Sequence, residues 1–327
     1  MRVDHLYYDG LGDQEKAAYD ILVRGFSTRQ SIVNVPYKRD ADLNSLFRAI
    51  KYEHPEFYYV DLYATVVYRN SLFEEYHLVY RYSEEETREK DRKIESAVQS
   101  ILRDTEHVSE YRREMIIHDR IVRNVTYGEQ EDAVYKAHTM EGVFLDRLSV
   151  CEGISMAFKY LCGKVGIPCT VIVGDLLIGA RYQQKKYNGH AWNLAEIKGH
   201  TYYLDVTNDN YRYGYLSHTY FNLSEQLIST THRLPTNIRL PRCDYVYTPC
   251  PLINNWDDIV KAMKAGYEKK QAAVEMRISR RFLRVHEVQE QLNQHLADAS
   301  LVKLLKCIKS YISEEKAHVF TVLLEYP

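Results

Sequence analysis

The sequence lacks the features that mark membrane, secreted and nucleic-acid-binding proteins. No run of apolar residues is long enough to span a bilayer. The N-terminal stretch MRVDHLYYDGLGDQEK has no apolar segment of the kind that secretory signals contain. Basic and acidic residues nearly balance, 43 against 45, so the charge gives no support for a nucleic-acid-binding surface. These absences predict a cytoplasmic protein with no membrane and no nucleic-acid partner.

Motifs for metals, cofactors and disulfides are absent as well. The six cysteines include no C-x-x-C pair, and a chain of 327 residues is neither short nor cysteine-rich, which argues against a disulfide framework. There is no glycine-rich phosphate loop, no H-E-x-x-H and no G-x-S-x-G. The D-x-D-x-D-G pattern of calcium loops does not occur either. We therefore expect no cofactor, no metal and a reducing environment.

Apolar residues make up 45% of the chain, and they recur at the spacings typical of amphipathic helices and strands. The first hundred residues are predicted as helix-helix-strand-strand-helix, with helices at 10–25, 40–52 and 84–103 and two strands, at 57–69 and 72–82, joined near 70–71. Asp40 is the expected N-cap of the second helix. A further helix is expected at 107–127, where His118 lies on the apolar stripe and is interpreted as a core histidine rather than a ligand.

The remainder of the chain contains a loop-like stretch at 208–255 with several prolines, where we place a soft domain boundary. The elements predicted beyond it are a helix at Asp257–Gly266, a strand at Ala272–Ile278, helices at His286–Leu296 and Ala299–Ile312, and a strand at His318–Tyr326. The whole pattern predicts an α+β protein in three parts. These are an N-terminal α+β module at 1–106, a core at 107–250 and a C-terminal α+β module at 251–327.

The stretch SVCEGISMAFKYLCGKVG, residues 149–166, is predicted as a helix with a cysteine at its start. Ser149 and Glu152 have the S-x-x-E spacing of a capping box, which would make Ser149 the N-cap and Cys151 the second helical residue. The unpaired N–H groups at this positive end of the helix favour the thiolate form of Cys151. Taken alone, the cysteine is better explained as a small buried residue, and its position at the helix start together with the downstream partners described below reverses that preference.

A hairpin follows, in which HAWNLAEI and HTYYLDVT are joined by a Lys-Gly turn at 198–199. If these two residues form the whole turn, His190 lies opposite Thr207, and Asp205 shares a face with His190 one diagonal step away. An odd change of register would put the two side chains on opposite faces. The predicted roles are Cys151 as nucleophile, His190 as its base and Asp205 as the residue that orients the imidazole.

Two further candidates accompany this triad, and alternatives stay open for each residue. The backbone N–H of Cys151 is a natural oxyanion donor, and His138 and Trp192 are candidates for oxyanion stabilisation or substrate contact. Trp192 is most simply explained as hairpin core. The alternative for His190 is a surface residue at a strand edge, and the alternative for Asp205 is the cap of a turn. Zinc binding by Cys151, His190 and Asp205 is a weaker alternative, because a structural site needs a fourth ligand.

Four short motifs resemble the core of the transglutaminase-like superfamily, chiefly its bacterial branch. In chain order they are Val150-Cys151-Glu152-Gly153, Gly166-Ile167-Pro168-Cys169, Gly189-His190-Ala191-Trp192-Asn193 and Tyr203-Leu204-Asp205-Val206-Thr207. The resemblance covers about residues 110–235. It implies a papain-like core, with a nucleophile helix packed on an antiparallel sheet, and a triad of Cys151, His190 and Asp205. Many relatives have a tryptophan where this chain has Asn208, so the resemblance defines the triad better than the substrate groove.

The function that the resemblance implies is cysteine-dependent acyl transfer on a peptide or protein amide through a thioester. Both a thiol hydrolase and a transamidase fit, with hydrolysis slightly favoured because transamidation needs a site that holds an amine and excludes water. A non-catalytic binding or scaffold protein on the same fold is the alternative. The 29 tyrosines suit either class, since tyrosine serves both binding surfaces and half-buried cores.

Overall fold

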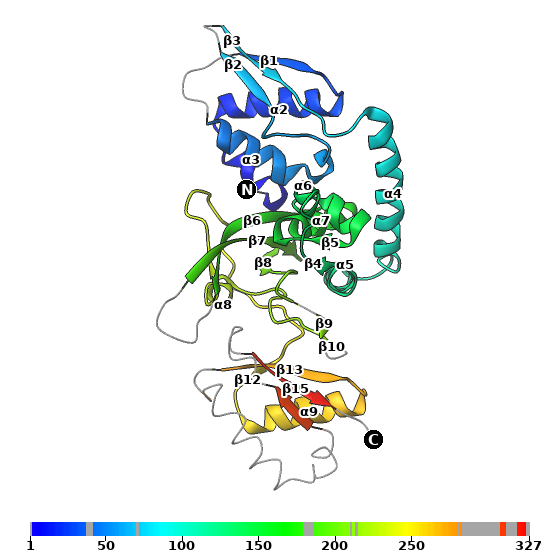
Figure 1. Ribbon diagram of the computed structural model, residues 1–327. Helices are drawn as coiled ribbons and strands as arrows, with labels where there is room; N and C mark the ends of the chain where they lie inside the picture. Colours follow the sequence, from blue (N-terminus) through cyan, green and yellow to red (C-terminus); the bar gives the residue numbers. More distant parts are fainter. Residues whose placement is uncertain are drawn as a thin grey trace. The chain divides into compact units, whose positions relative to one another are not determined.

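The computed structural model describes residues 2–36, 42–69, 72–178, 186–209, 211–212, 215–279, 282, 308–311 and 319–324. Helices and mostly antiparallel sheets alternate along the chain, which confirms the α+β class (Figure 1). Two compact units are distinguished. The first comprises Met1–Val173, His190–Thr201 and Pro235–Arg242, and the second comprises Gly174–Gly189, Tyr202–Leu234 and Cys243–Pro327. The division into three parts at residues 106 and 250 stays a prediction. None of the described helices combines the length and the apolar character that a membrane crossing requires.

The N-terminal part of the first unit shares one core between two helices and a three-stranded antiparallel sheet. The helices are α2 (Asp13–Ser27) and α3 (Leu43–Glu53), and the strands in sheet order are β1 (Ile32–Pro36), β3 (Phe73–His77) and β2 (Val66–Arg69). Three short helical segments also belong to this part. The segments η1 (Val3–His5) and α1 (Leu6–Asp9) precede α2, and η2 (Pro55–Phe57) follows α3. Fully buried Leu22, Phe26, Leu46, Ile50 and Tyr76 form the centre of this core.

Strand β1 is missing from the sequence-based prediction. Its buried residues, Val33 and Val35, alternate with exposed ones and pair with β3. A strand of five residues is too short for its alternation to stand out from a loop. Strand β2 is also shorter than predicted, because the chain forms η2 and turns before it. The expected cap Asp40 and the expected joint at 70–71 lie outside the described residues, while the side chain of Asp42 accepts from Asn44 N and caps α3.

Many tyrosines of the first unit have their hydroxyl groups inside it. Tyr7 donates to Val171 O at 2.8 Å, and Tyr58 donates to the Asp91 carboxylate at 2.8 Å. Tyr76 is fully buried and donates to Glu74 at 2.7 Å. Such internal hydrogen bonds explain part of the tyrosine content by packing and weaken the case for a tyrosine-lined binding surface.

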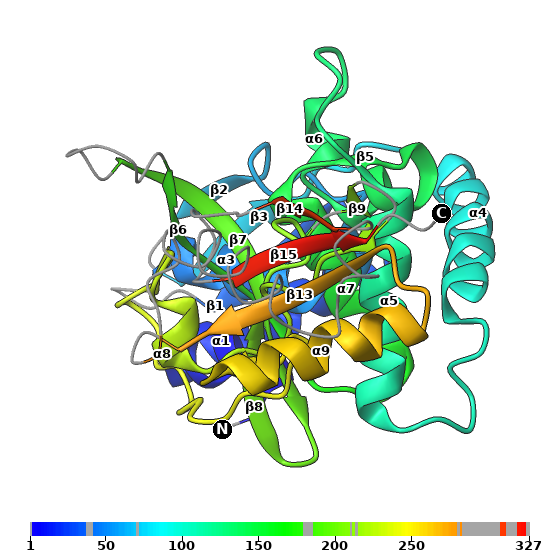
Figure 2. The same ribbon diagram turned by 90° about the horizontal axis from the view of Figure 1, so that it is seen from below.

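The middle of the chain is helical, as predicted. Helix α4 (Glu84–Leu102) starts with a complete capping box at Ser83, and α5 (Glu110–Asn124) lies beside it (Figure 2). The chain then continues through β4 (Thr126–Tyr127), α6 (Val134–Ala137), the π-helical segment η3 (Gly142–Asp146), β5 (Leu148–Ser149) and α7 (Cys151–Lys164). Helix α7 is buried along most of its length, since α5, α6, η3 and β5 all contact it.

A four-stranded sheet follows α7. Its order is β11 (His232–Arg233), β6 (Cys169–Ile178), β7 (Lys186–Ile197) and β8 (His200–Leu204). Between β7 and β8 only Lys198 and Gly199 form the turn, with φ angles of 53° and 77°. Two left-handed residues make a type I′ turn, whose twist matches that of a hairpin. The predicted two-residue turn is therefore confirmed.

The second unit contains the chain after β8. Short elements occupy the stretch predicted as loop, namely β9 (Tyr211–Arg212), β10 (Tyr215–Leu216), α8 (Glu225–Ile228) and β12 (Leu252–Ile253). Helix α9 (Trp256–Glu268) and strands β13 (Ala273–Ile278) and β15 (Val319–Leu324) confirm three of the five predicted C-terminal elements. Strand β14 (Ile308–Tyr311) completes a sheet of order β12-β13-β15-β14, with α9 along β13 (Figure 2). The predicted helix at His286–Leu296 lies outside the described residues. The predicted helix at Ala299–Ile312 is wrong over its described part, because Ile308–Tyr311 pair with β15 as strand β14.

Candidate active site

Cys151 is the first residue of α7, and its side chain is partly exposed. The N-cap is Val150, so the predicted capping box at Ser149 is wrong. Ser149 instead ends β5, where it pairs with Tyr127, and its hydroxyl donates to Ala137 O at 2.7 Å. Because that hydroxyl is already bound and its backbone is held in a strand, Ser149 cannot cap the helix. The helix therefore starts one residue later than predicted, and Cys151 is its N-terminal residue.

Gly153 explains how this helix end can lie so close to the preceding chain. A Cβ atom at this position would lie 2.6 Å from Thr139 O, and closer still to Ser149 Oγ and Ala137 O. Real Cβ atoms do not approach backbone oxygens this closely, so only glycine fits without movement of the backbone. The Cys-Glu-Gly motif thus combines a nucleophile candidate with the glycine that lets its helix pack tightly.

Glu152, the next residue, is fixed by three partners. Its carboxylate accepts from Tyr52 Oη at 2.7 Å and pairs with Lys51 Nζ at 2.8 Å, and His138 Nδ1 lies 3.0 Å away. Burial alone would raise the pKa of Glu152, but the hydrogen bond from His138 and the charge of Lys51 outweigh it and hold the pKa at about 2. Glu152 is therefore charged at neutral pH and connects α3 to the first turn of α7.

His138 lies directly after α6 with each ring nitrogen near a carboxylate. Nδ1 faces Glu152, and Nε2 lies 3.4 Å from Glu129. The hydrogen bond to Glu152 raises the pKa of His138 above its ordinary value of 6.5, although partial burial opposes this shift. The structure thus gives His138 a role in holding Glu152, while its predicted role as an oxyanion donor stays a prediction.

The ion pair between His138 and Glu152 makes a testable contribution to stability. The folded pKa of His138 is raised, so its contribution is complete below about pH 6.5 and is lost as the pH rises through the folded pKa. The folded pKa of Glu152 is lowered, so its contribution is complete above about pH 4.5 and is lost as the pH falls toward 2. We expect His138→Gln to lower the free energy of unfolding more at pH 5.5 than at pH 9, as measured by urea denaturation. A Glu152→Gln background should remove this pH dependence, and its persistence there would assign it to another group.

His190 lies in β7 and is 7% exposed. Its ring stacks on the ring of Trp192 two residues later, with a centroid distance of 6.0 Å and an interplanar angle of 22°. Trp192 has no exposed surface, which fits the alternative that it is hairpin core. The stacking restricts the orientation of the imidazole, so Trp192 supports His190. A direct contact of Trp192 with substrate stays a prediction.

Asp205 directly follows β8 and is fully buried. One carboxylate oxygen accepts from the backbone N–H groups of Thr207 and Asn208 at 3.0 and 3.1 Å, the turn-capping geometry that was the alternative for this residue. The other oxygen lies 2.9 Å from His232 Nε2, and His232 is equally buried. No sequence pattern indicates His232, because it lies in a two-residue strand without periodicity. The predicted interaction of Asp205 with His190 stays a prediction.

These three candidates fall within one matched segment of the chain. Residues 81–206 match the family model of the transglutaminase-like superfamily, and the segment includes Cys151, His190 and Asp205. The chain carries a transglutaminase-like domain. The matched segment begins just before α4 and ends just after β8, so it contains α4 to α7 and the strands β6, β7 and β8, while β11 lies beyond it.

Solved structures resemble the chain only weakly. One described as a TGase is 14% identical, with a TM-score of 0.32, and the match covers 58% of this chain and 56% of that one. A candidate cysteine protease from Cytophaga hutchinsonii is 14% identical, with a TM-score of 0.27, and the match covers 44% of this chain and 61% of that one. The chain therefore spans less than two thirds of either protein, and no function is carried over from them. No curated protein matches the sequence.

Among the described cysteines, Cys151 of the transglutaminase-like domain differs from the others in exposure. Cys162, Cys169, Cys243 and Cys250 are all buried. Burial raises the pKa of the Cys162 and Cys250 thiols well above the ordinary value, which keeps them protonated and unreactive. Of the cysteines in the described part of the chain, only Cys151 is thus open to a reagent or a substrate.

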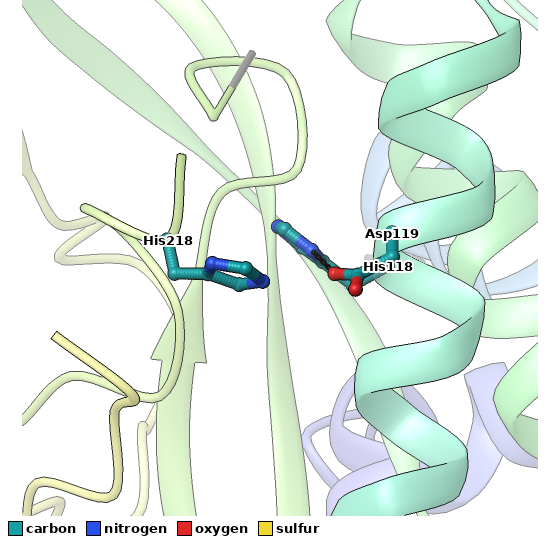
Figure 3. A group of neighbouring side chains, drawn as sticks. All are labelled: His118, Asp119 and His218. Carbon is teal, nitrogen blue, oxygen red and sulfur yellow. Dashed lines mark hydrogen bonds and ion pairs between the residues drawn. The ribbon is translucent and has the colours of Figure 1, made fainter. Parts of the chain in front are cut away.

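Helix α5 of the domain carries a second histidine with a carboxylate neighbour. His118 is completely buried on the apolar face, as predicted, and its Nδ1 lies 3.0 Å from the carboxylate of Asp119 (Figure 3). Figure 3 also draws His218, which belongs to the second unit and packs edge-on against Phe221 at 5.8 Å. None of these residues is part of the predicted triad.

Proposed function

We propose that this chain is a cysteine-dependent acyl-transfer enzyme that acts on peptide or protein amides through a thioester. One observation carries the proposal: Cys151, the partly exposed cysteine of the described chain, is the first residue of α7 within the transglutaminase-like domain. A thiol at a helix N-terminus is near the positive end of the helix dipole and near backbone N–H groups without an acceptor in the helix, a position suited to a nucleophile.

In the proposed reaction, Cys151 Sγ attacks the amide carbonyl carbon while His190 takes the thiol proton. The tetrahedral intermediate then collapses, the C–N bond breaks, and His190 returns the proton to the leaving amine. Water or a second amine attacks the resulting thioester, releases an acid or a new amide, and regenerates the thiol. Asp205 acts as the positioning residue that holds the imidazole in one tautomer, and His232 in turn fixes the Asp205 carboxylate.

The first turn of α7 supports the charge that develops on the carbonyl oxygen. The N–H groups at the start of a helix have no acceptor inside it, so they are available to an oxyanion. The backbone N–H of Cys151 is our proposed donor. Hydrolysis remains the favoured outcome, because it requires only water at the thioester, whereas transamidation requires a bound amine.

Thiol reactivity tests this proposal without knowledge of the substrate. We expect Cys151 to react with iodoacetamide faster than the other five cysteines at pH 7, where an ordinary thiol with a pKa of about 8.5 is mostly protonated. His190→Ala should slow the labelling of Cys151, because it removes the proposed base. Mass spectrometry of timed samples identifies the labelled cysteine, and His107→Ala serves as a control on an exposed loop. Labelling of Cys151 no faster than that of the buried cysteines would favour the non-catalytic binding protein.

A further inference from the structure

A cavity of about 360 Å³ lies beside the first turn of α7, entirely within the first unit. Its walls come from α3, η2 and the chain after it, from α6 and from α7. The volume is within the range of small-molecule and side-chain pockets in proteins. Nothing in the proposed chemistry uses this cavity, so its occupant has to be inferred from its lining.

The lining is mostly apolar and aromatic. Phe57, Tyr58, Tyr63 and Tyr135 contribute rings, and Met156 and Val134 contribute aliphatic surface from α7 and α6. Rings and a thioether favour contact with another aromatic or apolar group. Transfer of a side chain such as phenylalanine from water into this cavity is therefore favourable.

The charged groups of the lining already have partners within the protein. Lys51 pairs with Glu152, and His138 bonds to the same carboxylate. Arg81 pairs with Asp61 at 2.9 Å and lies 4.6 Å from the centre of the Tyr135 ring. A charged ligand group would have to break one of these pairs, whereas an apolar group would not. The lining thus selects against charge.

The cavity is also adjacent to the proposed nucleophile. Glu152 and Met156, which line it, lie one and five residues after Cys151 on the same helix. Cys151 itself packs against the core cluster that contains Ile50, Val60 and Met156 of the cavity wall. A peptide held at Cys151 therefore has a neighbouring side chain within reach of the cavity.

We propose that this cavity binds an apolar, preferably aromatic, side chain of the peptide substrate next to the amide that Cys151 attacks. The inference rests on the proposed function and adds a substrate class to it. Because α3, η2 and Tyr63 precede the matched domain, the N-terminal part of the chain then determines specificity.

Binding is tested first without any chemistry. In protein labelled with ¹³C-methyl methionine, N-acetyl-phenylalaninamide should shift the Met156 methyl resonance, which Met156→Leu identifies. N-acetyl-aspartic acid α-amide, which keeps a charged side-chain carboxylate, should not shift it, because the cavity selects against charge. The Met263 methyl, buried in the C-terminal module, serves as an internal control. No shift at Met156 with the phenylalanine compound would overturn the proposal.

The substrate role is tested with peptide chloromethyl ketones, in which the Cys151 sulfur–carbon bond forms as chloride leaves. We expect acetyl-Phe-Gly or acetyl-Gly-Phe chloromethyl ketone to inactivate Cys151 about tenfold faster, or more, than the Gly-Gly reagent. Val134→Trp places a ring at the 39% exposed rim of the cavity and should abolish this preference. Val66→Trp alters a similarly exposed valine on β2, away from the cavity, and should preserve it.

The outcomes separate the two proposals. Rapid iodoacetamide labelling of Cys151 without a preference for phenylalanine overturns the cavity inference and leaves the proposed function standing. A Cys151 that reacts with none of the reagents overturns the proposed function, and the substrate role of the cavity with it. A phenylalanine preference that Val134→Trp removes and Val66→Trp retains supports both.

Discussion

We expect Cys151→Ala to abolish the proposed amide turnover while the protein stays folded. The reaction requires a thiolate at the start of α7, and alanine leaves no atom that can form the thioester. We expect the rate to fall on the order of 10³-fold or more, the loss typical of removing a nucleophile. Turnover is measured as ammonia or peptide release from casein and as incorporation of a fluorescent amine into casein, so that both hydrolysis and transamidation are detected.

The matched control for this experiment is Cys162→Ala, which removes a buried cysteine from the same helix. It should lower stability slightly through a small cavity but leave turnover per folded molecule unchanged. Equal turnover in wild type and Cys151→Ala would contradict a mechanism through Cys151, whereas no turnover in the wild type would favour the binding-protein alternative. Thermal melts of both variants exclude unfolding as the cause of any loss.

Gly153→Ala should lower the stability of the protein, although alanine usually stabilises the interior of a helix. In the interior of a helix, replacing glycine by alanine normally stabilises the helix by about 1 kcal/mol. Here its Cβ would overlap Ser149 Oγ and the carbonyl oxygens of Ala137 and Thr139, and no flexible side chain can yield at those carbonyls. Overpacking of this kind costs about 1–3 kcal/mol, which outweighs the gain in propensity. Urea unfolding measures the difference.

Gly163→Ala provides the matched comparison on the same helix. A Cβ there would meet no atom within 4 Å, so only the propensity term remains. We expect Gly163→Ala to be neutral or to stabilise by up to about 1 kcal/mol, opposite in sign to Gly153→Ala. If both substitutions stabilise the protein, the close contacts at Gly153 do not require glycine at this position, and the prediction is wrong.

The helices and the hairpin turn are predictable from the sequence because their signals are local. The stripe of α7 and the Lys-Gly turn at 198–199 each lie within a few residues, and the structure has both. The error at Ser149 has the same origin: the S-x-x-E spacing is local, but the acceptor of the Ser149 hydroxyl is the carbonyl of Ala137. A spacing rule cannot include that competing partner.

The parts of the candidate site that the sequence does not reveal depend on distant contacts. The partners of Glu152 come from α3 and from the residue after α6, and His232 reaches Asp205 from a strand of two residues. No periodicity connects such residues, because they are brought together only by packing. The cavity is of the same kind, since its lining is assembled from five separate segments of the first unit.

The bonds of Glu152 also limit where the chain can be divided. Lys51 and Tyr52, which hold the carboxylate, precede the segment at 81–206 that matches the family. A fragment cut to that segment would lack two of the three partners of the largely buried Glu152 carboxylate, which lies beside Cys151. Removing the partner of a buried charge typically costs several kcal/mol of stability. The smallest autonomous piece that preserves the helix start is therefore longer than the family match.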